Sequence, residues 1–244
     1  MVDLLENAYP DFPGLNLTFE VREGLQKHRK VAQVSNLHPE TSKLETCTTL
    51  EAQIANLADE ITYYSHDLDD AVDFEILAPE QLQEVAVWNQ SCEAVREKIS
   101  DAREPELHKL IIRDIIDVQV GDVIISSAEA IHAAGVQNAD QVRRQERPLI
   151  CYGVELLAAN RELRRFLYKN VYYHPRVAEV NRNACEMLRG VFQAYVHEPE
   201  LLGDAATRRI EGEGLYRTVC DYIAGMTDRY LMEEHARLRE RAAA

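Results

Sequence analysis

The chain has 244 residues, 46% of them hydrophobic, which suffices for one large domain or two small ones. It contains only 10 glycines and 8 prolines, which favours helices, and no run of 18 apolar residues occurs, so we expect no membrane span. The net charge of −15 excludes strong non-specific binding to nucleic acid, because the phosphates would repel the protein.

The charge is distributed unevenly along the chain. Residues 1–140 carry 27 acidic and 10 basic side chains, whereas residues 141–244 carry 15 and 17. The acidic part could hold cations and the more basic part could meet anions, although solubility alone is a sufficient explanation. Five widely spaced cysteines without a CxxC pair are typical of reduced thiols, and the opening MVDLLENAYPDF lacks a signal-peptide pattern. We therefore expect a cytoplasmic protein.

The first third of the chain predicts a turn-rich entry segment followed by a long helix. The entry segment, 1–47, contains PDFPGLN and room for one short helix at 18–28. Thr48 and Glu51 have the spacing of a capping box, which predicts that the long helix begins there and runs to about Leu77.

The remaining elements are also predicted to be helical. A helical pair is expected over 79–134, in two pieces: an amphipathic helix over 79–100, with Leu82, Val85, Val87 and Trp88 in the core, and a long helix over 105–133 that is interrupted or bent near Gly121. The β-branched run in the second piece leaves a strand open as an alternative. Further helices are expected at 155–169, 175–196 and 214–241, within a C-terminal helical region over 149–244. The sequence therefore predicts an all-α fold, a compact multi-helix bundle forming a single domain over 1–244.

The long helix 48–77 has two opposite faces when it is drawn at about 100° per residue. Polar groups that can bind a hard metal ion or a polar ligand gather on one face: Asp59, Tyr63, His66, Asp67 and Asp70. The opposite face is apolar, formed by Leu50, Ile54, Leu57, Ile61, Tyr64 and Leu68. A polar face is most often simply solvated. A tyrosine between two aspartates, and aspartates near a helix C-terminus where the macrodipole disfavours them, favour a site instead.

A self-contained metal site is a weaker alternative. His66 and Asp67 are adjacent, and together with His38 and Asp117 they would make an H…HD…D set of metal ligands. Adjacent residues on a helix point about 100° apart, so such a pair needs other ligands to close around the ion.

Two long motifs resemble those of one enzyme family. The segment LEAQIANLADEITYYSHDLDDA is similar to the signature helix of the deoxynucleoside triphosphate triphosphohydrolases, the dGTPase-like branch of the HD-domain phosphohydrolases. The segment DYIAGMTDRY, 221–230, is a second match, and the segments at 9–28 and 163–177 fit the flanking pattern in the same order. The resemblance implies an HD-domain-like helical fold and hydrolysis of a dNTP to a deoxynucleoside and triphosphate.

The resemblance also implies roles for three residues of the polar face. Asp59 matches a metal ligand, Tyr63 matches a tyrosine that lies against the deoxyribose, and Asp67 matches the aspartate that takes the sugar 3′-hydroxyl. It gives His66 no role. A divalent metal, Mg²⁺ or Mn²⁺, a dNTP substrate and a homo-oligomer are implied in the same way.

The chain departs from the family pattern in its metal ligands. In the family, a first His and a His–Asp dyad lie upstream of the segment that matches 9–28, so three of the four ligands are absent here and only Asp59 is present. One carboxylate binds a divalent ion weakly. We therefore assign no catalytic residue and expect this chain alone to be inactive, as the C-terminal part of such an enzyme. The alternative is a non-catalytic helical module, derived from that family, for nucleotide binding or oligomerisation.

Overall fold

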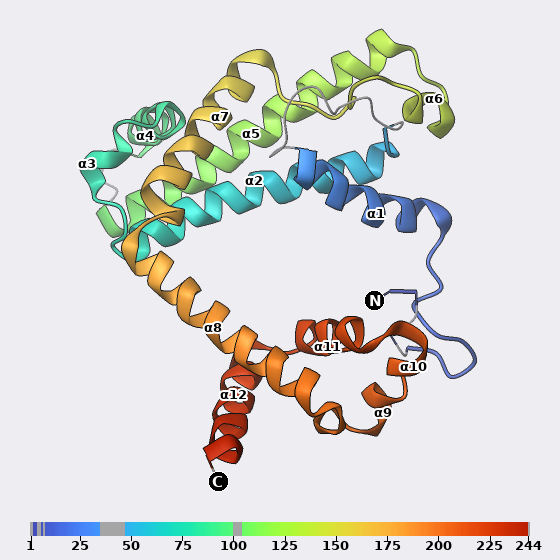
Figure 1. Ribbon diagram of the computed structural model, residues 1–244. Helices are drawn as coiled ribbons and strands as arrows, with labels where there is room; N and C mark the ends of the chain where they lie inside the picture. Colours follow the sequence, from blue (N-terminus) through green and yellow to red (C-terminus); the bar gives the residue numbers. More distant parts are fainter. Residues whose placement is uncertain (1, 4–5, 7, 35–46, 100–103, 244) are drawn as a thin grey trace. The chain divides into compact units, whose positions relative to one another are not determined.

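The computed structural model describes all residues except 1, 4–5, 7, 35–46, 100–103 and 244. All regular secondary structure of the described residues is helical, and no strand occurs among them, which confirms the all-α prediction (Figure 1). Within these residues, no helix combines the length and the apolar character that crossing a membrane requires. The chain divides into two units, residues 1–171 and 172–244, and each is described by itself.

The first unit is built around two long helices. Helix α2 lies against both α5 and α7, and α4 packs on the same two helices, while α1 lies against α2 (Figure 1). The helices of this unit are α1 (Phe19–Val34), α2 (Leu50–Asp73), α3 (Pro79–Leu82), α4 (Ala86–Lys98), α5 (Glu104–Ala134), α6 (Ala139–Arg143) and α7 (Val154–Leu167).

Helix α2 begins one residue later than predicted. Thr49, not Thr48, is the N-cap, and its hydroxyl accepts a hydrogen bond from the backbone nitrogen of Ala52 at 3.4 Å. The expected apolar face is buried in its second half, where Ile61, Tyr64 and Leu68 are in the core. Ile54 was expected in that face and is 52% exposed instead; the polar neighbour Gln53 is buried in its place.

The next two predicted helices differ from the structure in their continuity. The expected helix over 79–100 is divided into α3 and α4, because the chain turns at Gln83, whose backbone oxygen accepts a hydrogen bond from the Asn89 side chain at 2.8 Å. The four predicted core residues of this region are buried, as expected. Helix α5 is continuous through Gly121, so an interruption there and the alternative of a strand are both wrong, whereas the bend stays a prediction.

The second unit packs α8 against both α11 and α12. Along the chain, a short π-helical segment, η2 (Tyr168–Tyr172), directly follows α7 and comes before α8. The elements of the unit are α8 (Pro175–His197), η3 (Pro199–Leu202), α9 (Asp204–Thr207), α10 (Ile210–Glu213), α11 (Leu215–Ala224) and α12 (Asp228–Ala243). The helix expected over 214–241 is therefore two helices. That the two units form a single domain stays a prediction.

Among the described residues of the second unit, one charged group is buried in the core, the Glu234 carboxylate. Val191, Tyr195 and Val219 are completely buried, and the Tyr195 hydroxyl donates a hydrogen bond to the Glu234 carboxylate at 2.6 Å. Glu234 also accepts hydrogen bonds from Arg237, one turn further along α12. This hydrogen bonding offsets the cost of burying the carboxylate.

Candidate functional site

The three residues implied by the family resemblance lie on the outer side of α2. Asp59 is exposed, Tyr63 is 54% exposed and Asp67 is half-buried. The three positions are spaced by one helical turn each, so they follow one line along the helix. The face they share is not buried in apolar packing, and it is therefore accessible to a ligand.

Polar contacts beneath this face tie α2 to α5. Ser65 is completely buried, and its hydroxyl accepts a hydrogen bond from the Gln119 side chain at 3.3 Å. The hydroxyl of buried Tyr152 donates to the side-chain oxygen of Gln119 at 3.4 Å. The Gln119 amide thus joins three segments, and burial raises the pKa of the Tyr152 phenol, which stays protonated. These contacts hold the polar face on a fixed helix.

A cation from α7 lies against the apolar face of α2, over Tyr64. The Arg164 guanidinium, on α7, is 6.0 Å from the ring centroid of Tyr64 and 5.7 Å from that of Tyr168. Burial raises the pKa of Tyr64 to about 12, and Arg164 opposes that shift. Burial likewise raises the pKa of the Glu60 carboxyl, again with Arg164 acting in the opposite direction. The ring of Tyr64 also packs edge-on against Tyr63, with 5.4 Å between the centroids.

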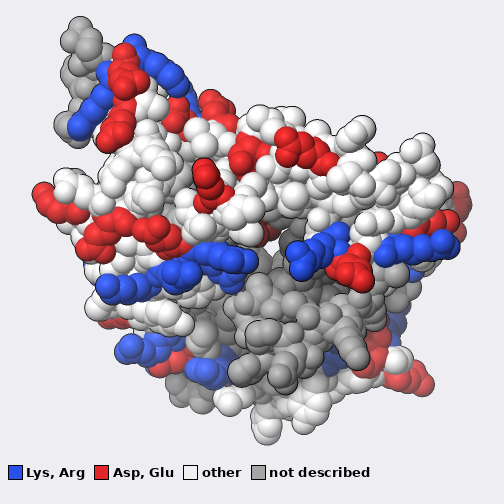
Figure 2. Space-filling model, turned by 90° about the horizontal axis from the view of Figure 1, so that it is seen from above, with Lys and Arg blue, Asp and Glu red and all other residues white. Residues whose placement is uncertain are grey.

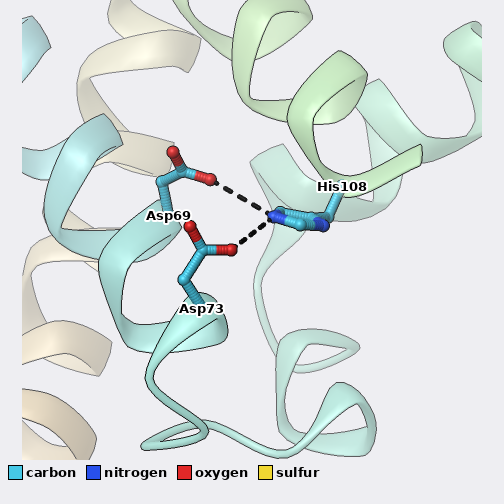
Figure 3. A group of neighbouring side chains, drawn as sticks. All are labelled: Asp69, Asp73 and His108. Atoms are coloured by element: carbon cyan, nitrogen blue, oxygen red, sulfur yellow. Dashed lines mark hydrogen bonds and ion pairs between the residues drawn. The ribbon is translucent and has the colours of Figure 1, made fainter. Parts of the chain in front are cut away.

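The C-terminal end of α2 carries the one group of possible metal ligands found among the described residues. Asp69 and Asp73 point toward His108 at the start of α5 (Figure 3). The Nε2 atom of His108 is 2.9 Å from Asp73 and 3.5 Å from Asp69. Helical periodicity did not single out His108. A signal existed in the pair His108–Lys109, the only basic residues between 104 and 112.

The two carboxylates of this group, Asp69 and Asp73, form ion pairs with Lys109. Its ammonium donates hydrogen bonds to Asp69 at 2.9 Å and to Asp73 at 2.6 Å. The contact with Lys109 lowers the pKa of Asp73, and the contacts with Asp73 and Asp69 raise the pKa of Lys109. The carboxylates therefore already have a cation. Their unfavourable position at a helix C-terminus is compensated from α5, so it does not by itself indicate a ligand site.

The weaker H…HD…D alternative finds no support in the geometry of the described residues. His38 lies outside them. His66 on α2 and Asp117 on α5 are exposed, and neither belongs to the group of metal-ligand side chains described above. Asp59 does not belong to such a group of three either.

The surface carries charged side chains of both signs (Figure 2). On the face shown in Figure 2, basic and acidic side chains both occur and are interspersed with uncharged surface.

Comparison with known proteins identifies relatives of nearly the whole chain. Residues 150–237 match the model of the phosphohydrolase-associated domain. The chain is 38% identical, over 98% of its length, to the deoxyguanosinetriphosphate triphosphohydrolase-like protein of Geobacter metallireducens, and 37% identical, over 98%, to that of Thiobacillus denitrificans. It covers 62% and 63% of these two relatives. The chain thus spans about three fifths of the length of the curated relatives that it matches.

Proposed function

The chain resembles the C-terminal portion of deoxyguanosinetriphosphate triphosphohydrolase-like proteins, and from this premise we propose that it supplies the deoxyribose-binding face of a dNTP triphosphohydrolase. The family reaction cleaves a dNTP into deoxynucleoside and triphosphate. Tyr63 would pack on the sugar, and Asp67 would accept a hydrogen bond from the 3′-hydroxyl. The observation that carries the proposal is the shared, accessible line of Asp59, Tyr63 and Asp67 on α2.

The chemistry of these side chains fits a deoxyribose. An aromatic ring offers a flat apolar surface to the sugar carbons, and a carboxylate accepts a hydroxyl hydrogen bond strongly. A ring in that place would also disfavour a 2′-hydroxyl, which would have to be desolvated against it. Discrimination for deoxyribose follows from the same residues.

The described residues do not fit a resident metal ion at Asp59. A divalent ion needs several ligands, and no group of three or more His, Cys, Asp or Glu side chains includes Asp59 among the described residues. We therefore assign no metal-dependent step to this chain and propose that it does not hydrolyse dGTP alone. For the whole enzyme, the resemblance extends the proposal to Mg²⁺ or Mn²⁺ and to a cytoplasmic homo-oligomer.

The first experiment measures sugar binding. Calorimetry with 2′-deoxyguanosine should give weaker binding for Tyr63→Ala and Asp67→Ala, each by about tenfold, the size expected for one lost contact. His66→Ala, a change of the neighbouring, exposed residue to which the resemblance gives no role, is the control and should bind as the wild type does. Equal affinities for Asp67→Ala and His66→Ala would overturn the assignment.

The second experiment tests catalysis by the chain alone. The purified chain with dGTP and Mn²⁺ or Mg²⁺ should release no tripolyphosphate. Release that disappears in Asp59→Ala would show that the chain is an enzyme in its own right. Stable hetero-oligomers with a full-length relative, without deoxyguanosine binding, would favour the second candidate, a non-catalytic assembly module.

A further inference from the structure

A pocket with a volume of about 600 Å³ lies between α4 and the first turns of α5, inside the first unit. Its size is within the roughly 300–1,000 Å³ typical of small-molecule sites. Leu82, Trp88, Leu107 and Ile111 form its apolar part, and all four side chains are buried. None of the residues proposed for the deoxyribose face lines this pocket.

The polar side of the pocket contains a cation. Arg96 on α4 is exposed, and no described residue forms an ion pair with it. Other polar groups in the pocket are already engaged: the Asn89 amide donates to Gln83, and the His108 ring contacts Asp73. Arg96 is therefore the group best placed to receive a ligand, and a guanidinium is suited to a carboxylate because it can donate two parallel hydrogen bonds.

We propose that the pocket between α4 and α5 binds a small monocarboxylate with a flat apolar body. The carboxylate pairs with Arg96, and the apolar body lies against Trp88 and the leucines beside it. The site is separate from the proposed deoxyribose face, and its test does not depend on that function. Glu93 also lines the pocket; its negative charge would suit an amine instead, so the experiment includes an amine of matched size.

Trp88 makes the test specific, because it is the only tryptophan of the chain. Titration with 3-phenylpropanoate should change the tryptophan emission saturably, and phenethylamine should bind more weakly. Arg96→Gln should lower the affinity for 3-phenylpropanoate by about tenfold or more, the usual effect of losing a hydrogen bond to a charged group. Arg113→Gln, a change of an exposed arginine on α5 outside the pocket, is the control and should bind as the wild type does.

Three outcomes would overturn the proposal. They are no saturable change in emission with the wild type, equal affinity in Arg96→Gln and Arg113→Gln, or binding of phenethylamine at least as tight as that of 3-phenylpropanoate. Because Arg96 is exposed, its replacement should leave the far-ultraviolet circular dichroism unchanged. A loss of affinity in Arg96→Gln would then report on binding and not on folding.

Discussion

The side chain of Gln53 binds the backbone of Leu149, 96 residues further along the chain, with 2.8 Å between the amide oxygen and the backbone nitrogen. The same oxygen accepts from the nitrogen of Ile150 at 3.1 Å, and the amide nitrogen donates to the Thr48 backbone at 2.8 Å. One buried amide therefore joins the start of α2 to the segment that leads into α7. It satisfies backbone groups that have no helical partner.

Gln53→Ala should destabilise the first unit by roughly 2–6 kcal/mol, because it leaves two buried N–H groups unpaired at about 1–3 kcal/mol each. Urea unfolding followed by tryptophan emission measures the change. Gln90→Ala, on the exposed side of α4, removes the same amide without a buried partner and should alter stability little. Similar losses in the two variants would contradict the role given to Gln53.

Two glycines should respond in opposite directions to replacement by alanine. A Cβ at Gly153 would lie 2.8 Å from the Asp122 carboxylate, which accepts the Gly153 N–H at 2.7 Å. Gly153→Ala should cost about 1–3 kcal/mol through this overlap. Gly121→Ala, in the middle of α5 with open space around it, should add about 0.5–1 kcal/mol of stability. Urea midpoints of the two variants should bracket that of the wild type.

Lys109→Met should lower stability and should do so less as salt is added. It leaves Asp69 and Asp73 without their ammonium partner, one helical turn apart at the end of α2. The exposed position of Lys109 makes the loss smaller than that of Gln53→Ala, and ions screen it. Lys98→Met, which removes a single contact with Asp114, is the control. A loss for Lys109→Met that is independent of ionic strength would rule out this explanation.

Glu234→Gln should flatten the acid limb of the stability profile of the second unit. Hydrogen bonds from Arg237, the larger cause, and from Tyr195 lower the pKa of the Glu234 carboxyl below its unfolded value. A lowered folded-state pKa stabilises above the unfolded pKa, about 4.3, and the stabilisation is lost as pH falls below it. Thermal unfolding between pH 7 and pH 3, followed by circular dichroism, should show a smaller acid loss in Glu234→Gln than in the wild type.

The exposed neighbour Glu233 provides the comparison for that experiment. It pairs with Arg229 at the surface, where both side chains are well exposed. Glu233→Gln should therefore follow the wild-type profile closely. Parallel acid limbs for the wild type and Glu234→Gln would show that the buried carboxylate contributes nothing to the pH dependence.

Helical periodicity predicted the elements well where contacts are local. It placed α2, α7 and α8 within a few residues and identified Val87 and Trp88 among the buried side chains of α4. It failed at Gln53, because a glutamine reads as a surface residue and its partners, the nitrogens of Leu149 and Ile150, are distant in sequence. For the same reason, Ile54 was expected in the buried apolar face, although it is exposed.

The break between α11 and α12 has a signal in the sequence, although periodicity predicts one helix over 214–241. Gly225 ends α11, and the Thr227 hydroxyl accepts a hydrogen bond from the Tyr230 nitrogen at 3.3 Å, as at the start of a new helix. Glycine followed closely by Thr–Asp is a stop and start pattern. At the candidate site, periodicity found the shared face of Asp59, Tyr63 and Asp67, whereas their roles came from the resemblance alone.

The position of Trp88 in the first unit means that tryptophan emission and circular dichroism report on different parts of the molecule. Residues 172–244 contain no tryptophan, so their unfolding is silent in tryptophan emission while their helices still contribute to circular dichroism. Coincident transitions by both methods would mean that the two units melt as one cooperative body. Separate transitions would allow the free energy of unfolding of each unit to be measured in the intact chain.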